Sequence, residues 1–172
     1  MKHSDVIALL NKKSACSEAT AWVESHRWTA KTLWSRCENG SWMLWIAARI
    51  GVDRKLLVRA ACACARESLK HVRAGDDRPH IAIETAERWT RGEATIDEVQ
   101  TAAVDAAYAA ADAAYAAAAA AYAAASAAYA ADAAAAYAHR KARKESLKRS
   151  AQLVREHIPY AVIAALLPQV TP

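Results

Sequence analysis

The sequence predicts an all-α protein, and three observations support this prediction. Residues 102–138 are almost entirely alanine, the strongest helix former. The 172 residues include only four glycines and four prolines, the residues that interrupt helices most strongly. Elsewhere, the capping residues Ser, Asp and Thr stand directly before apolar runs. We therefore expect a single domain over residues 1–172, with about six or seven helices.

The N-terminal part of this domain, residues 1–94, is expected to form short helices, which we place over residues 6–10, 17–28, 42–50, 54–72 and 81–91. Ser17, Ser41 and Asp53 are the expected N-caps of three of them, and Gly92 is expected to end the last. The helix over 42–50 is apolar on nearly every face, which predicts that it is buried.

A long helical segment, residues 95–158, follows. Thr95 and Glu98 match a capping box, and no helix breaker occurs before Pro159. A continuous helix over 96–157 would be about 90 Å long, whereas a compact domain of this size is about 40 Å across. The segment therefore either bends, near 138–141 where the composition changes, or projects as a dimerising arm. Residues 159–172 are expected to form a short C-terminal cap.

Tyrosines recur at regular spacing along this segment, at positions 108, 115, 122, 129 and 137. Each seven-residue step shifts a side chain by about 20° round the helix, and the final eight-residue step restores the position, so the five rings share one face. The favoured interpretation is a core helix whose rings fill the gaps between closely packed helices. The rings could instead form an interface, or an aromatic wall for a base or a peptide.

Composition restricts the class of function. The formal net charge of +5 favours anionic partners. No phosphate-binding glycine loop, zinc-protease motif or nucleophile elbow occurs, so we expect no enzymatic activity, no cofactor and no metal. The four cysteines are expected to be buried free thiols in a reducing cytoplasm. The alanine segment is too weakly apolar, and too often interrupted by aspartate, to predict a membrane span.

Arginines and tryptophans form the first candidate site. Arg59, Arg66 and Arg73 recur every seven residues, and Arg78 follows. Their guanidinium groups either pair with nearby carboxylates or line a pocket that holds phosphate or carboxylate groups. If they line a pocket, three tryptophans would stack beside the ligand, namely Trp42, Trp45 and Trp89. Each of these tryptophans also suits a core position.

Basic residues between 139 and 155 form the second candidate site, an anion or partner surface. The alternative is a solvated helix face. The residues chosen for the surface are Arg140, Lys141, Arg143, Lys144, Lys148 and Arg149. No DNA-reading motif accompanies them, so sequence-specific DNA binding is not expected.

One motif of the N-terminal part comprises residues 57–66, Asp77-Arg78-Pro79 and residues 82–94, followed by the alanine segment. This motif resembles the Imm-5-like, alanine-rich immunity protein family. The whole chain also resembles proteins encoded by phages and bacterial genomes. The resemblance implies a small cytosolic protein that neutralises a toxin by stoichiometric binding, and it offers no catalytic residues.

We therefore expect stoichiometric binding without turnover, in the cytoplasm of the host cell. The first hypothesis is a phage-type anti-defence sponge that sequesters a phosphorylated, nucleotide-like immune signal. In that case Arg66→Ala or Arg78→Ala would abolish binding and leave the fold intact. The alternatives are an immunity or inhibitor protein that masks a toxin or defence protein, and a helical nucleic-acid-binding protein. Self-association through the Ala/Tyr-rich helices is also expected.

Overall fold

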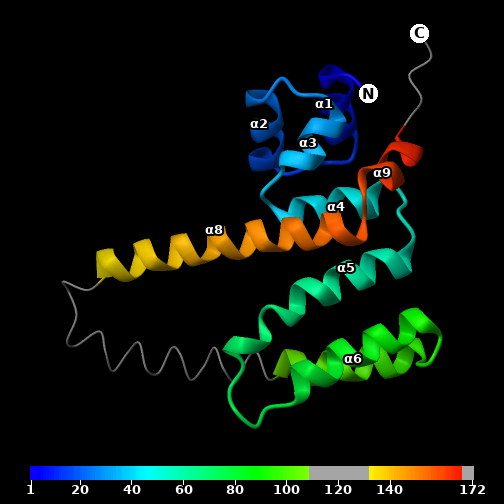
Figure 1. The fold of residues 1–172 in the computed structure, drawn as a ribbon, viewed down its shortest axis with the longest axis vertical. Coiled ribbons are helices and arrows are strands. Elements are labelled where there is room, and N and C mark those ends of the chain that lie inside the picture. Colours follow the sequence, from blue (N-terminus) through cyan, green and yellow to red (C-terminus); the bar gives the residue numbers. More distant parts are fainter. Residues whose placement is uncertain (109–131, 168–172) are drawn as a thin grey trace. The chain divides into compact units, whose positions relative to one another are not determined.

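The computed structural model describes residues 1–108 and 132–167 (Figure 1). Every regular element in these ranges is a helix, which confirms the predicted all-α class. The described ranges contain more helical segments than the six or seven expected. The chain divides into two compact units, residues 1–61 with the chain from 147 onward, and residues 62–146.

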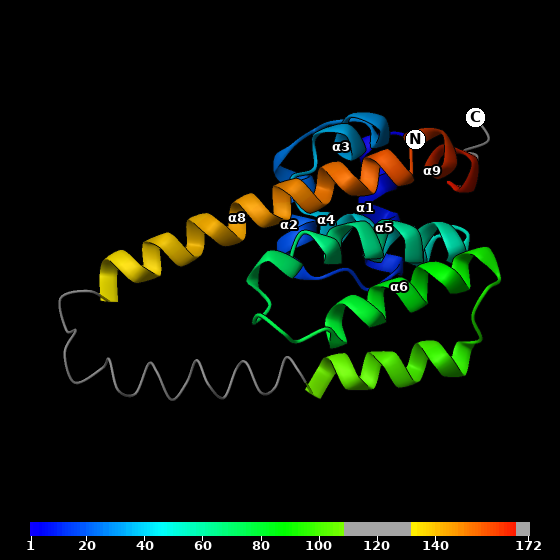
Figure 2. The same ribbon diagram turned by 60° about the horizontal axis from the view of Figure 1, so that its bottom comes forward.

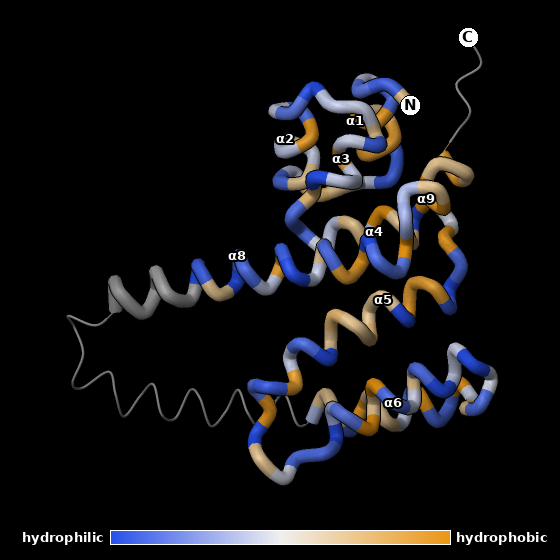
Figure 3. The backbone as a smooth tube through the Cα atoms, in the orientation of Figure 1, coloured by the Kyte–Doolittle hydropathy of each residue, from blue (hydrophilic) through white to orange (hydrophobic). Residues whose placement is uncertain are grey.

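The first unit contains the helices α1 (His3–Lys12), α2 (Ser17–Ser25), α3 (Ala30–Arg36), α4 (Gly40–Arg49) and α9 (Tyr160–Leu166), the beginning of α5 (Arg54–Arg66) and the end of α8 (Asp132–His157). Its core includes Met43 of α4, Val154 of α8 and Ile158, which are 0–2 % exposed. Hydrophobic residues recur along α4 and α9 (Figure 3).

The caps explain where these helices begin. Asp53 Oδ1 accepts hydrogen bonds from the backbone N–H groups of Lys55 and Leu56, at 3.0 and 3.1 Å, as an N-cap should. At α4 the N-cap is Asn39, whose Oδ1 accepts from the Trp42 N–H at 3.2 Å. The predicted caps Ser41 and Ser17 were both wrong, because each helix begins earlier than expected. Ser41 is the second residue of α4, and Ser17 is the first residue of α2, whose N-cap position is Cys16.

Three of the predicted helices have different bounds or burial. The predicted helix over 17–28 ends at Ser25, because the Ser25 hydroxyl and the His26 ring bind the Trp22 carbonyl oxygen, at 2.8 and 2.7 Å. A separate helix, α3, then follows. The expected helix over 54–72 ends at Arg66 and continues as a 3-10 turn over Leu69–His71. Burial of α4 is one-sided, on Gly40, Met43 and Ala47.

The second unit contains the end of α5, the helix α6 (Arg78–Arg91), a helix over residues 96–108 and the first part of α8. The helix α6 ends at Gly92, whose φ of 81° is left-handed, as predicted. The capping box is also confirmed, since Thr95 Oγ1 accepts from the Glu98 N–H at 3.2 Å and a Glu98 oxygen accepts from the Thr95 N–H at 2.6 Å. The helix over 96–108 runs back antiparallel beside α6 (Figures 1 and 2).

The structure describes only the ends of the expected long helix. It is helical over 96–108, and α8 continues through 138–141 without interruption. Tyr115, Tyr122 and Tyr129 lie outside the described residues, so the path between the two ends and the shared tyrosine face stay predictions. Tyr108 is 64 % exposed, which contradicts a core position for this ring in the single chain.

Candidate functional site

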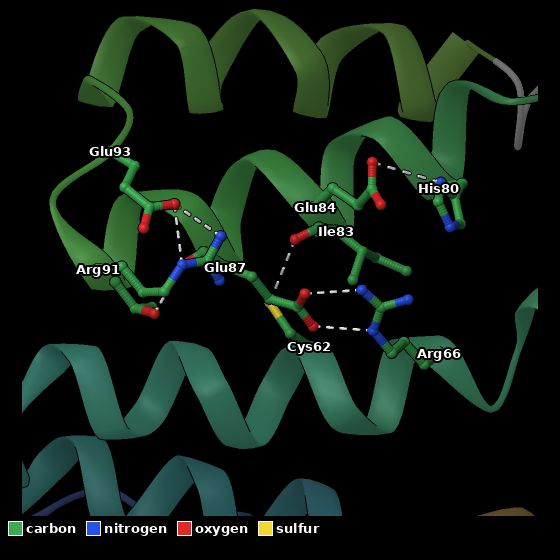
Figure 4. Close-up of polar contacts among 9 residues, drawn as sticks. Cys62, Arg66, His80, Ile83, Glu84, Glu87, Arg91 and Glu93 are labelled. Atoms are coloured by element: carbon green, nitrogen blue, oxygen red, sulfur yellow. Dashed lines mark hydrogen bonds and ion pairs between the residues drawn. The ribbon is translucent and has the colours of Figure 1, made fainter.

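The Arg66 guanidinium is bound by a carboxylate. Arg66 lies in the last turn of α5, and Glu87 lies on α6 (Figure 4). Nε and Nη2 of Arg66 donate to the two oxygens of Glu87 at 2.8 and 2.6 Å, a bidentate ion pair. This hydrogen bonding lowers the pKa of the Glu87 carboxyl. Arg66 therefore holds α5 and α6 together and does not present a free anion-binding group.

Arg78 is bound in the same way. Its Nε and Nη2 donate to the two oxygens of Asp76 at 2.8 Å each, and the pKa of the Asp76 carboxyl is lowered by these bonds. A surface depression of about 520 Å³ surrounds this pair, and both Asp76 and Asp77 line it beside Arg73. Two carboxylates at the depression repel a phosphate group, so the loop does not form the arginine pocket expected for a nucleotide.

Because Arg66 is bound to Glu87, replacing Arg66 should affect the stability of the fold. We expect Arg66→Ala to lower the free energy of unfolding by about 1 kcal/mol or less, because an ion pair this accessible to solvent contributes little. In the unfolded chain a glutamate has a pKa of about 4.3, and above this pH the ion pair stabilises the fold fully. The contribution of the pair is lost as the pH falls through the lowered pKa of Glu87 in the folded protein. Urea unfolding of wild type and Arg66→Ala at pH 7 and at pH 3 measures the difference in unfolding free energy between them.

The difference between wild type and Arg66→Ala should shrink at pH 3. If the same difference persists at pH 3, Arg66 stabilises the fold by packing of its aliphatic chain instead. The charge-conserving Arg66→Lys variant is the control for the bidentate geometry, since its single ammonium cannot form both hydrogen bonds.

The predicted site residues are divided between the two units. Trp42 and Trp45 lie on α4 of the first unit, and Arg59 lies in the part of α5 that belongs to the same unit. The second unit contains Trp89, which is half-buried, together with the other three arginines, Arg66, Arg73 and Arg78. Trp42 and Trp45 line an apolar cavity.

Two other arginines contact tryptophan rings. The guanidinium of Arg49 lies 5.5 Å from the centre of the Trp45 ring, and that of Arg36 lies 5.3 Å from the Trp28 ring. Sequence reasoning missed both pairs. The four-residue spacing of Trp45 and Arg49 on one helix could have indicated the first pair, whereas the second depends on the turn between α2 and α3.

The basic stretch of α8 is exposed, as both sequence interpretations, a solvated helix face and an anion or partner surface, require. Arg140, Lys141, Arg143 and Lys144, here called the basic segment, are exposed and make no ion pair with any described residue. Figure 3 shows hydrophilic residues along this stretch. Lys148 differs, because its Nζ lies 2.9 Å from a Glu38 oxygen, and Arg149 is exposed. The segment thus presents four cations within about one and a half turns.

An exposed apolar row lies on the helix over 96–108. Ile96, Val104 and Tyr108 are 50 %, 53 % and 64 % exposed, and they stand at positions that differ by multiples of four. Residues at this spacing lie along one inclined ridge of a helix, in which the exposed Gln100 separates Ile96 from Val104 and Tyr108. Sequence reasoning singled out only Tyr108 of the row, although the four-residue spacing could have indicated the other two.

The cysteines are free thiols, but not all are buried. Cys37 and Cys62 are buried, and burial raises the pKa of both thiols. Cys62 Sγ lies 3.9 Å from the Ile83 carbonyl oxygen (Figure 4). Cys16 is exposed and Cys64 half-buried, so the expectation of four buried thiols was wrong. Within the described ranges, no cluster of His, Cys, Asp and Glu is arranged to hold a metal ion.

Comparison with known protein families, with curated proteins and with solved structures gives no match. The resemblance to immunity proteins therefore stays a prediction. Among the described helices, none combines the length and the apolar character needed to cross a membrane.

Proposed function

We propose that this chain is a non-catalytic binding protein that neutralises a protein partner, a toxin or a defence protein, by forming a stoichiometric complex. The observation that supports this most is the exposed apolar row of Ile96, Val104 and Tyr108. Side chains of this kind gain free energy when a partner removes them from water, and exposed apolar patches commonly mark protein interfaces.

Charge favours an acidic partner. The basic segment is exposed, makes no ion pair with the described residues and belongs to the same unit as the apolar row. Cations at the rim of an interface attract a carboxylate-rich surface and accelerate association. The partner surface we propose is therefore an apolar patch with carboxylates near it.

The other two hypotheses have less support. A phosphorylated small ligand would have to displace Glu87 from Arg66 or Asp76 from Arg78, both bound bidentately. A nucleic acid would use the basic segment, but it offers nothing to the apolar row, because nucleic-acid interfaces are polar and strongly cationic.

Replacing the basic segment tests the charge part of the proposal. The immobilised chain is used to capture proteins from nuclease-treated lysate of the cells that naturally contain it, and the captured protein is then purified. We expect a one-to-one complex by calorimetry. Changing Arg140, Lys141, Arg143 and Lys144 to glutamine should weaken it on the order of tenfold at low salt, because the attraction is electrostatic.

The matched control removes four exposed cations of the first unit, by changing Lys12, Lys31, Arg54 and Lys55 to glutamine. It lowers the net charge equally and should leave the affinity nearly unchanged. Equal weakening by the two variants would contradict the proposal, since net charge alone would then explain binding. Capture of nucleic acid from untreated lysate, with no protein bound after nuclease treatment, would favour the nucleic-acid hypothesis instead.

A further inference from the structure

A second binding surface lies in the first unit, where four aromatic rings contact one another. The centre of the Trp22 ring on α2 lies 6.2 Å from that of Trp28 and 6.1 Å from that of Trp42 on α4. The centre of the His26 ring lies 4.9 Å from that of Trp22 and 4.4 Å from that of Trp28. These four residues are here called the aromatic cluster. Each of them is partly exposed, so the cluster offers aromatic surface to a ligand.

Two arginines stack on tryptophan rings at or beside this cluster. The Arg36 guanidinium lies 5.3 Å from the centre of the Trp28 ring, and the Arg49 guanidinium lies 5.5 Å from that of Trp45. Trp45 and Arg49 follow Trp42 by three and seven residues, which places all three on one side of α4. Both arginines are exposed, and neither forms an ion pair with a described residue. Their N–H groups can therefore donate to an anion while the rings hold the guanidinium planes.

The chain around the cluster carries a net positive charge. From Trp22 to Arg49 it has four cationic residues and two glutamates, a net charge of +2. All four cationic side chains are exposed, namely Arg27, Lys31, Arg36 and Arg49. Such a surface favours an anionic partner.

The carboxylates of this region leave the two stacked arginines without a bound counter-charge. Glu38 is bound by Lys148, whose Nζ lies 2.9 Å from a carboxylate oxygen. Glu24 lies about 160° round α2 from Trp22. A third carboxylate, Glu18, precedes this stretch and belongs to the first turn of α2. The cationic groups beside the rings are therefore available to a ligand.

Aromatic rings beside exposed arginines are the features with which proteins bind single-stranded nucleic acid. Bases stack on such rings and on guanidinium planes, and phosphates accept hydrogen bonds from arginine. A protein partner would instead favour a surface with an apolar centre. Among the described residues, the large hydrophobic side chains that are exposed lie outside α2, α3 and α4, namely Ile81, Ile96, Val104, Tyr108 and Leu166. The surface therefore fits a single strand better than it fits a protein.

We propose that this surface of the first unit binds single-stranded nucleic acid, with bases stacked on the aromatic cluster and phosphates bound by Arg36 and Arg49. In a duplex the faces of the bases are already stacked on one another, so the rings have no base to contact. The surface shares no residue with the one proposed for the protein partner, so either proposal can fail while the other holds.

Two single strands of equal charge test this proposal, a thymidine strand of about ten nucleotides and an abasic strand with the same number of deoxyribose phosphates. Both are titrated into the full chain with Arg140, Lys141, Arg143 and Lys144 changed to glutamine, so that the basic segment cannot hold the phosphates. We expect the thymidine strand to bind on the order of tenfold more tightly, the effect of at least one stacked base, and to quench tryptophan fluorescence. Absence of saturable binding, or equal affinity for the two strands, would overturn the proposal.

Changing Arg36 and Arg49 to glutamine tests the phosphate contacts. The loss of two contacts should make the plot of log affinity against log salt concentration less steep by about 1.4. The matched control changes Lys12 and Arg54, exposed cations elsewhere in the first unit, to glutamine. It lowers the net charge equally and should leave the slope nearly unchanged. The same change of slope in both variants would show that net charge alone holds the strand.

Trp28→Leu tests the stacking. It should bring the affinity for the thymidine strand close to that for the abasic strand, and circular dichroism shows whether the variant is folded. If it does not fold, the comparison of the two strands and the arginine variants still decides the matter. If folded Trp28→Leu keeps its affinity for the thymidine strand but no longer captures a protein that wild type captures from nuclease-treated lysate, the surface belongs to a protein partner and the proposal is wrong.

Discussion

The Gly40→Ala variant is expected to lose about 2–3 kcal/mol of unfolding free energy, the upper part of the range for overpacked sites. Gly40 is the first residue of α4 and packs against α8. A Cβ atom there would lie 2.6 Å from the carbonyl carbon and the Cβ of Ser150, and 2.7 Å from the Ala151 backbone nitrogen. Contacts this short require part of the structure to move.

The movement is costly because the obstacle is helix backbone and not the end of a flexible side chain. Ala151 is 0 % exposed, and Ala47 and Met43 of α4 are 0 % and 2 % exposed, so separating α4 from α8 opens a closely packed core. Alanine is otherwise a better helix former than glycine by about 1 kcal/mol. The steric cost must exceed that gain for the variant to be destabilised.

Urea unfolding followed by circular dichroism measures this effect. Ser41→Ala, at the exposed neighbouring position, is the control and should change stability little. An unchanged or raised midpoint for Gly40→Ala would show that α4 and α8 do not approach this closely in solution.

Replacing Val104 by aspartate is expected to weaken the proposed complex about 100-fold, in the range of interface hot spots. Val104 is 53 % exposed and belongs to the apolar row, between Ile96 and Tyr108. A carboxylate at this position must lose its hydration when an apolar partner surface covers it. Calorimetry with the purified partner measures the loss.

Much of the fold could be predicted because its signals are local. The Asp53 cap, the Thr95–Glu98 capping box and the left-handed Gly92 each depend on a few consecutive residues, and all three are in place. The end of α2 could not be predicted, since a histidine side chain that binds the Trp22 carbonyl resembles any other polar residue in the sequence.

The candidate site could be predicted only in part, because it depends on contacts between helices. For Arg66 the sequence left two alternatives, an ion pair or a ligand-binding role, and the structure shows an ion pair whose partner is 21 residues away on α6. Nothing in the sequence distinguishes Glu87 from the neighbouring acids until α5 and α6 pack together. The exposure of the basic segment could be predicted without knowing any contact between helices, because it follows from the composition of the segment itself.

Calorimetric titration of the purified partner into wild type, Val104→Asp and Ala21→Asp tests the central claim most directly. Ala21 is exposed on α2 of the first unit, so both variants add one carboxylate at an exposed helical position, and only Val104→Asp places it in the apolar row. The proposal predicts a one-to-one complex that Val104→Asp weakens about 100-fold and Ala21→Asp leaves nearly unchanged. Equal affinities of all three chains for the partner would contradict the apolar row as its binding surface.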